Sequence, residues 1–139
     1  MAVSTTGAQV NVYARDPDAL ARFYTGLGLS ETFRFPERGA AEHVEVGVGG
    51  MTLGLTSAEA LDRLAGLAAE PGRPSAEVVL WCTDVDALVA VAQALGARPV
   101  APPRVFDGRI RAAWVEDPEG NRVKIVALVA PGAGGRAEG

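Results

Sequence analysis

Apolar residues recur at two different spacings along the chain, and the spacing changes in the same order in each half. From Leu20 to Leu27 they follow the i, i+3, i+4, i+7 pattern of an amphipathic helix, and from Leu88 to Leu95 they do so again. Short alternating runs that are typical of strands lie on both sides of these segments. Each half is therefore predicted to contain one helix within a set of strands.

The two halves match each other without a gap at a constant offset of 68 residues, so that Val10 matches Val78. An aspartate, Asp16 or Asp84, precedes each predicted helix. Its carboxylate can accept hydrogen bonds from the first free backbone N–H groups of the helix. A glycine follows each helix, where a left-handed backbone conformation commonly ends one. The repeat is therefore a repeat of structure as well as of sequence.

Three further strands follow each helix, so that each half is predicted to be a βαβββ module and the fold class is α+β. A glycine pair, Gly49 and Gly50, and the turn Asp117 to Gly120 separate the last two strands of the halves. The predicted strands are Val10–Ala14, Thr32–Phe35, His43–Val48 and Met51–Leu55, then Val78–Cys82, Arg98–Ala101, Ile110–Glu116 and Arg122–Leu128.

We expect a single domain over residues 1–139. The first module takes residues 8–57, a helical linker 58–74, the second module 75–129 and a flexible tail 130–139. Ser57 can cap a linker helix with Leu61, Leu64 and Leu67 on one side, and residues 71–74 are expected to end it. The tail is rich in Gly and Ala, a composition that does not favour a packed core.

Composition limits which partners the protein is expected to bind and in which cellular compartment it is expected to occur. The chain is 48% hydrophobic with a formal charge of −4 and has no run of Lys or Arg, so nucleic acid and anionic membranes are not expected partners. The single cysteine, Cys82, excludes an internal disulfide, fits a reducing cytoplasm and is expected to be a small buried side chain rather than a nucleophile. No apolar stretch approaches the ~18 residues of a membrane span. A cytoplasmic protein is expected.

The repeat, together with the helical segment Ala21 to Gly28 and the turn Asp117 to Asn121, resembles the vicinal oxygen chelate superfamily. This superfamily includes glyoxalases, extradiol dioxygenases and bleomycin resistance proteins. The resemblance implies that the two modules form an open mixed β-barrel with the helices outside. It also implies a small-molecule ligand and a homodimer.

The resemblance further implies four metal-ligand positions, on the first and last strand of each module. They are Gln9, Gly54, Glu77 and Lys124. Gly54 has no side chain, and the ammonium of Lys124 has no lone pair while it is charged. Only Gln9 and Glu77 remain as candidate metal ligands. Two ligands out of four do not make a metal site, so the usual metal centre is not expected, and no other cofactor is expected either. A displaced metal site that uses His43, Glu45 and Glu77 is the alternative.

Strand alternation predicts which side chains face a cavity. Val44 and Val46 should pack under a helix, so His43 and Glu45 should face the opposite way and are also candidate catalytic bases. The predicted ligand-binding residues are Gln9, Asn11, Tyr13, His43, Glu45, Glu77, Trp81 and Lys124. The faces of Phe33, Phe35, Phe106 and Trp114 stay open.

Two pairs among these residues have alternative interpretations. Lys124 and Glu77 are expected either to form a buried ion pair or to contact the ligand. Tyr13 and Trp81 match in the repeat and either clamp a flat ligand or fill the barrel.

The function expected from these observations is a metal-free binding protein of the bleomycin-resistance type. Such a protein sequesters an antibiotic or a natural product in the barrel or in a dimer cleft. One alternative is a metal-dependent glyoxalase-like lyase, isomerase or dioxygenase. A metal-free enzyme that uses His43 or Glu45 as a base is another. The last is a sensor or partner-binding module with a vestigial pocket.

Overall fold

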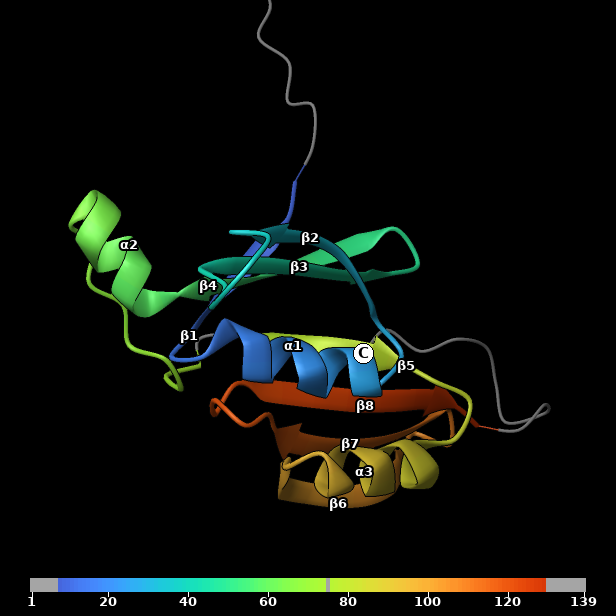
Figure 1. The fold of residues 1–139 in the computed structure, drawn as a ribbon. Coiled ribbons are helices and arrows are strands. Elements are labelled where there is room, and N and C mark those ends of the chain that lie inside the picture. Colours follow the sequence, from blue (N-terminus) through green and yellow to red (C-terminus); the bar gives the residue numbers. More distant parts are fainter. Residues whose placement is uncertain (1–7, 75, 130–139) are drawn as a thin grey trace, which may run out of the picture. The chain divides into compact units, whose positions relative to one another are not determined.

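The computed structural model describes residues 8–74 and 76–129 (Figure 1). The chain divides into two compact units, Met1–Pro71 and Gly72–Gly139. The single-domain expectation stays a prediction, and the predicted flexible tail, 130–139, lies outside the described residues. Among the described residues, no helix has the length and apolar character that a membrane span requires.

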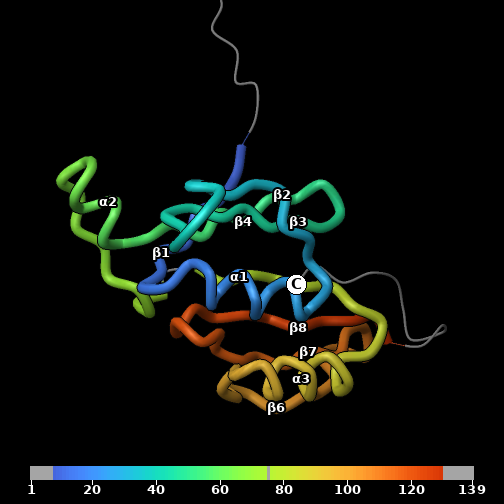
Figure 2. Tube along the Cα trace, in the orientation of Figure 1, coloured from blue at the N-terminus to red at the C-terminus, as the bar shows by residue number. Residues whose placement is uncertain are grey.

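The first unit is a four-stranded sheet with two helices. Its elements are β1 (Val10–Ala14), α1 (Pro17–Gly26), β2 (Ser30–Phe35), β3 (His43–Val48), β4 (Met51–Ser57) and α2 (Ala58–Ala65). The strand order is β1-β4-β3-β2, with β1 parallel to β4 and the other pairs antiparallel. The first βαβββ module is therefore confirmed, and Figure 2 traces its path.

The second unit repeats this topology. Its elements are β5 (Glu77–Trp81), α3 (Val85–Ala94), β6 (Arg98–Phe106), β7 (Ile110–Glu116) and β8 (Arg122–Leu128). The strand order is β5-β8-β7-β6, again with one parallel pair. The α+β class and the two modules are confirmed. A barrel that combines the two sheets stays a prediction.

The helix starts follow the local signals in the sequence. The Asp16 carboxylate accepts a hydrogen bond from the Ala19 backbone N–H at 3.1 Å, and the Asp84 carboxylate accepts one from Ala87 at 3.0 Å. The glycine that follows the C-cap of each of these helices has a positive φ. The repeated caps explain why both helices begin at matched positions.

Two elements differ most from the prediction, while the bounds of β2, β4 and β5 differ by one or two residues. Strand β6 extends to Phe106, with a register irregularity between Ala101 and Arg104 that accommodates two prolines. Helix α2 ends at Ala65, earlier than predicted, because Gly66 adopts a left-handed conformation with φ of 68°. The prediction of a longer linker helix, with Leu67 on its apolar side, is therefore wrong.

Each sheet packs one face against the helix of its own module. On the first sheet the buried side chains on this face are Val44, Val46, Leu53 and Leu55. On the second sheet they are Val115, Val123 and Ile125. Strand alternation predicted the positions of Val44 and Val46 correctly, whereas Val48, at the end of β3 with the same parity, and Val10, on edge strand β1, are exposed. The opposite face of each sheet is not covered by the helix of its module, and it carries the polar and aromatic side chains described below.

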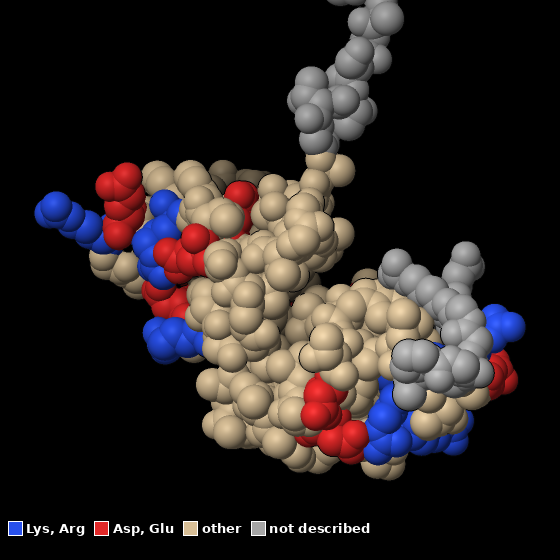
Figure 3. Space-filling view, turned by 90° about the vertical axis from the view of Figure 1, so that its right-hand side faces the viewer, with Lys and Arg blue, Asp and Glu red and all other residues tan. Residues whose placement is uncertain are grey.

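Surface charges occur largely as pairs of opposite sign. The Arg98 guanidinium lies 2.7 Å from the Glu116 carboxylate, and Arg111 lies 2.7 Å from Asp86. Figure 3 shows one face of the molecule, on which acidic and basic side chains gather in mixed groups. Exposed pairs of this kind contribute about 0–1 kcal/mol each. On the face that Figure 3 shows, the distribution of charge therefore does not mark out a binding surface.

Candidate functional site

The first sheet carries a polar network on the side opposite α1. We call this side the network face, defined by Gln9, Asn11, His43, Glu45 and Thr56. The Gln9 side-chain amide donates to Glu45 Oε2 at 3.0 Å and to Asn11 Oδ1 at 3.0 Å. These bonds connect the start of β1 with β3 across the intervening strand β4.

His43 is held at both ring nitrogens. Its Nε2 lies 3.0 Å from Glu45 Oε2, and its Nδ1 lies 3.0 Å from Thr56 Oγ1. Hydrogen bonds from His43 and then Gln9 hold the pKa of the Glu45 carboxyl below its usual value, although burial opposes them. An ionised carboxylate only accepts, so the imidazole N–H at Nε2 must donate to Glu45. Glu45 is therefore a fixed negative charge at neutral pH.

Gly54 occupies the centre of the network face. It pairs with Asn11 on one side and with Glu45 on the other. A Cβ atom at Gly54 would lie 1.9 Å from Asn11 Oδ1 and 3.0 Å from His43 Cε1. The missing side chain therefore leaves the space that the Asn11 amide and the His43 ring occupy.

Aromatic rings flank the polar network. Phe33 lies opposite Glu45 in the strand register, and its ring centroid is 6.1 Å from that of His43. Tyr13 lies opposite Thr56. Phe33 is 49% exposed and Tyr13 is 43% exposed, so both rings present apolar surface beside the charged and polar groups.

The second sheet carries a different cluster on the side opposite α3. We call this side the tryptophan face, defined by Glu77, Trp81, Phe106, Trp114 and Lys124. The Trp114 indole N–H donates to Glu77 Oε2 at 3.0 Å. Lys124 Nζ lies 5.5 Å from the centroid of the Trp114 ring, and the Phe106 ring meets the same indole edge-on at 5.7 Å. The ammonium and the ring face attract each other as a cation–π pair.

The expected ion pair between Lys124 and Glu77 does not form in the described part of the chain. Trp114 lies opposite Lys124 in the strand register. From there it offers its N–H to Glu77 and its ring face to the ammonium. Sequence reasoning missed this role because it left the face of Trp114 open, although Trp114 falls at the position of β7 that matches Glu45 of β3.

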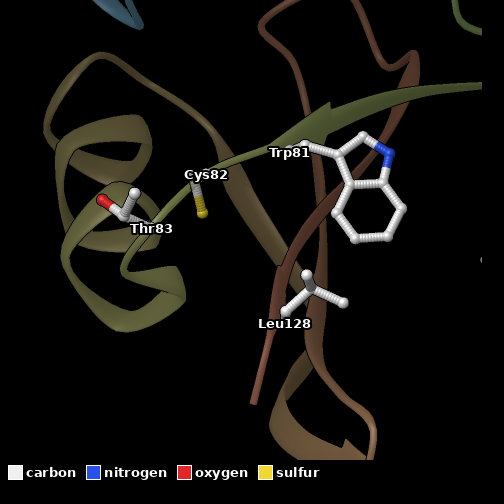
Figure 4. Close-up of a pocket in the computed structure, with 4 residues that line it drawn as sticks. All are labelled: Trp81, Cys82, Thr83 and Leu128. Carbon is white, nitrogen blue, oxygen red and sulfur yellow. The ribbon is translucent and has the colours of Figure 1, made fainter. Parts of the chain in front are cut away.

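Trp81 lies at the end of β5 beside a shallow open pocket of about 550 Å³. Figure 4 shows the indole of Trp81, the thiol of Cys82 and the side chain of Leu128 around this pocket. Burial raises the pKa of the Cys82 thiol. A thiol that stays protonated at neutral pH is a weak nucleophile, which agrees with the expectation that Cys82 is not one. The expectation of a buried side chain is wrong, because Cys82 is only partly buried and lines this pocket.

The four positions implied as metal ligands do not fit a metal ion. In the first unit the Gln9 amide is bonded to Glu45, and Gly54 supplies no ligand atom. In the second unit Lys124 is cationic, and Glu77 is bonded to Trp114. No group of three or more His, Cys, Asp or Glu among the described residues is placed to hold a metal. The displaced site considered from the sequence combines His43 and Glu45 of the first unit with Glu77 of the second, and it stays a prediction.

The family model of the glyoxalase/bleomycin resistance protein/dioxygenase superfamily matches residues 7–125. The chain belongs to this superfamily, as the repeat and its turns predicted. A search of curated proteins finds no significant match.

Solved structures with the same fold cover most of the chain. A glyoxalase/bleomycin resistance protein/dioxygenase family enzyme from Burkholderia phytofirmans PsJN has a TM-score of 0.74 and 26% identity, over 87% of this chain and 97% of that chain. TioX from Micromonospora sp. ML1 has a TM-score of 0.69 and 22% identity, over 88% and 99%. Lactoylglutathione lyase from Agrobacterium tumefaciens has a TM-score of 0.65 and 21% identity, over 89% and 95%. The likenesses confirm the fold.

Proposed function

We propose that the chain is a metal-free binding protein of the bleomycin-resistance type, which sequesters a small antibiotic or natural product. One observation carries the proposal. Of the positions implied as metal ligands, Gln9 and Glu77 are hydrogen-bonded to other side chains of the protein, while aromatic rings on the same faces stay exposed. Ligand sites commonly combine such apolar surface with a few fixed polar groups. The protein works as a homodimer in this proposal.

The network face suggests the chemistry of the ligand. Glu45 is ionised, because its hydrogen bonds lower its pKa, and it therefore favours a cationic group or an N–H donor. Phe33 and Tyr13 offer exposed rings on which a flat molecule can stack. A flat compound with a basic group fits these features, and the formal charge of −4 is compatible with its approach.

Calorimetric titration tests the proposal with a panel of flat cationic antibiotics and glycopeptide antibiotics. At least one member is expected to bind, and Phe33→Ala should weaken that binding about tenfold, since it removes a stacking surface. Val48→Ala is the matched control, because Val48 is equally exposed on β3 but has the parity of the helix-covered face. Absence of heat and of any melting shift across the whole panel would overturn the proposal.

A metal-free enzyme is the second candidate, because Thr56, His43 and Glu45 form a hydrogen-bonded chain through one imidazole. In such a chain the carboxylate orients the ring, and Nδ1 can take a proton from a bound molecule by way of the Thr56 hydroxyl, which passes on its own proton as it receives one. Turnover that His43→Ala abolishes, with the fold intact, would favour this candidate. Stoichiometric Zn, Ni, Mn or Fe in protein purified without chelator would instead favour a metal-dependent lyase, isomerase or dioxygenase. The sensor function stays a prediction.

A further inference from the structure

Lys124 is an unusual residue on the tryptophan face. Its side chain is 6% exposed, and it makes no hydrogen bond or ion pair with any described residue. Lysine is rarely buried to this degree unless it is paired. Its contact with the Trp114 ring leaves the three N–H donors of the ammonium unused, because a ring face is not a conventional acceptor.

The Lys124 ammonium makes no hydrogen bond or ion pair with a described residue, although most of the residue is buried. Among the described residues, no fully buried side-chain nitrogen or oxygen lacks a hydrogen-bond partner, so Nζ is not an atom of that kind. Lys124 lies on the same face of the sheet as the exposed apolar side chains Val79 and Trp81.

The acidic side chains around Lys124 are already engaged. Glu77 accepts from the Trp114 indole at 3.0 Å, and Glu116, on the adjacent strand β7, is held by Arg98 at 2.7 Å. Val79 lies opposite Lys124 on β5, and it is 38% exposed. Lys124 thus has no direct ion pair among the described residues, although the Glu77 carboxylate on the same face keeps its charge, and it lies next to exposed apolar surface.

We propose that Lys124 holds the carboxylate of an aromatic or similarly flat ligand, whose apolar body rests on the β5 side of the tryptophan face. This inference rests on the proposed function and assigns an acidic group to a ligand of the second unit's face. The carboxylate accepts a charge-assisted hydrogen bond from Nζ. The Glu77–Trp114 bond fixes the indole beneath the ammonium, so that the cation is held in place before the ligand arrives.

Benzoate is a suitable probe, and benzamide is its neutral counterpart of nearly the same shape. Each is titrated into the ¹⁵N-labelled full chain, and the two indole N–H resonances are followed, with Trp81→Phe used to assign them. Benzoate is expected to shift the Trp114 resonance and to bind at least tenfold more tightly than benzamide, because only benzoate carries the charge. Equal affinity for the two probes would overturn the inference, and so would a Trp114 resonance that does not move.

Lys124→Met keeps an unbranched apolar stem and removes the charge, so benzoate binding should fall at least tenfold, to the level of benzamide. Arg122→Met is the matched control, because Arg122 is an exposed cation two residues earlier on the same face of β8. It should change the affinity for benzoate less than threefold. An equal loss of affinity in both variants would mean that the overall positive charge of the face, and not Lys124 in particular, attracts benzoate, and it would overturn the inference. If Lys124→Met fails to fold, the comparison of benzoate with benzamide in the unaltered chain decides the question. If the probes bind equally while a panel antibiotic still binds, the anionic subsite fails and the proposed function stands.

Discussion

The network face and the tryptophan face occupy matched positions in the two modules, and each has one hydrogen bond that runs from the start of the first strand to the third. In the first module Gln9 donates to Glu45. In the second module Glu77 accepts from Trp114. The end points are equivalent in the strand register, but the donor and the acceptor have exchanged places.

The residue between these end points accounts for the rest of the difference. It is Gly54 in the first module and Lys124 in the second. Without a side chain at Gly54, the Asn11 amide and the His43 ring move into the centre, and the face becomes a connected polar surface with a negative charge. With Lys124 in place, the centre is a cation that lies over an aromatic ring. One backbone register thus supports an anionic polar network on one face and a cation–π pair at the centre of the other.

The largest expected effect is on the free energy of unfolding. It compares the loss of packing at Trp114 on β7 with the loss of hydrogen bonds at the matched position, Glu45 on β3. Trp114→Ala should lower the free energy of unfolding by about 2–3 kcal/mol, because the indole packs against Phe106 and the buried cluster beneath it and is partly buried. Glu45→Ala should cost about 1 kcal/mol, because it removes hydrogen bonds rather than apolar contacts. Urea unfolding of both variants measures the difference, and equal losses would contradict the contrast drawn between the two faces.

A smaller effect tests whether the central glycine makes room for its neighbours. Alanine normally stabilises a strand relative to glycine by about 0.5–1 kcal/mol, yet Gly54→Ala should destabilise the protein by about 1.5 kcal/mol. The reason is that the new Cβ displaces the Asn11 side chain and crowds His43.

The same substitution in an Asn11→Ala background provides the control. Most of the clash is then gone, so the cost of Gly54→Ala should shrink by about 1 kcal/mol, and thermal unfolding of the four proteins in the cycle measures this coupling. Additive effects would mean that Gly54 serves another purpose.

The smallest expected effect is a pH dependence of the network face. The folded-state pKa of Glu45 lies below its reference value of 4.5, so its stabilising contribution is fully present above that pH and is lost as the pH falls through the lower folded-state pKa. Glu45→Gln should therefore cost about 1 kcal/mol near about pH 6 and progressively less below 4.5. Urea midpoints across this range test the sign. Val48→Ala, which changes no titratable group, should show a constant difference.

The fold was predictable because its signals are local and occur twice. Asp16 and Asp84 cap their helices through contacts within three residues, and strand alternation separates the covered face from the open one. The full length of β6 was not predictable, since Pro102 and Pro103 argue against a strand. The structure tolerates them because β6 is an edge strand, where a missing backbone N–H need not break a ladder.

The sheet face on which each candidate residue lies was predictable, but the partners of their side chains were not. Alternation placed Lys124 on the face opposite the helix, and the structure bears this out. Glu77 is bonded to Trp114 and not to Lys124. Which of the two side chains reaches Glu77 depends on how the strands are aligned. Such alignment follows from the pairing of β7 with β8, which a single sequence does not specify.

The exchange of donor and acceptor has a consequence for how a duplicated scaffold can diversify. A cross-strand bond that functions in either direction lets one copy place a cation at its central position while the other copy keeps a glycine there. Three matched positions, at Gln9, Gly54 and Glu45 or at Glu77, Lys124 and Trp114, then act as a compact cassette. Transplanting one cassette into the other module offers protein engineering a route to two like-charged walls from a single gene.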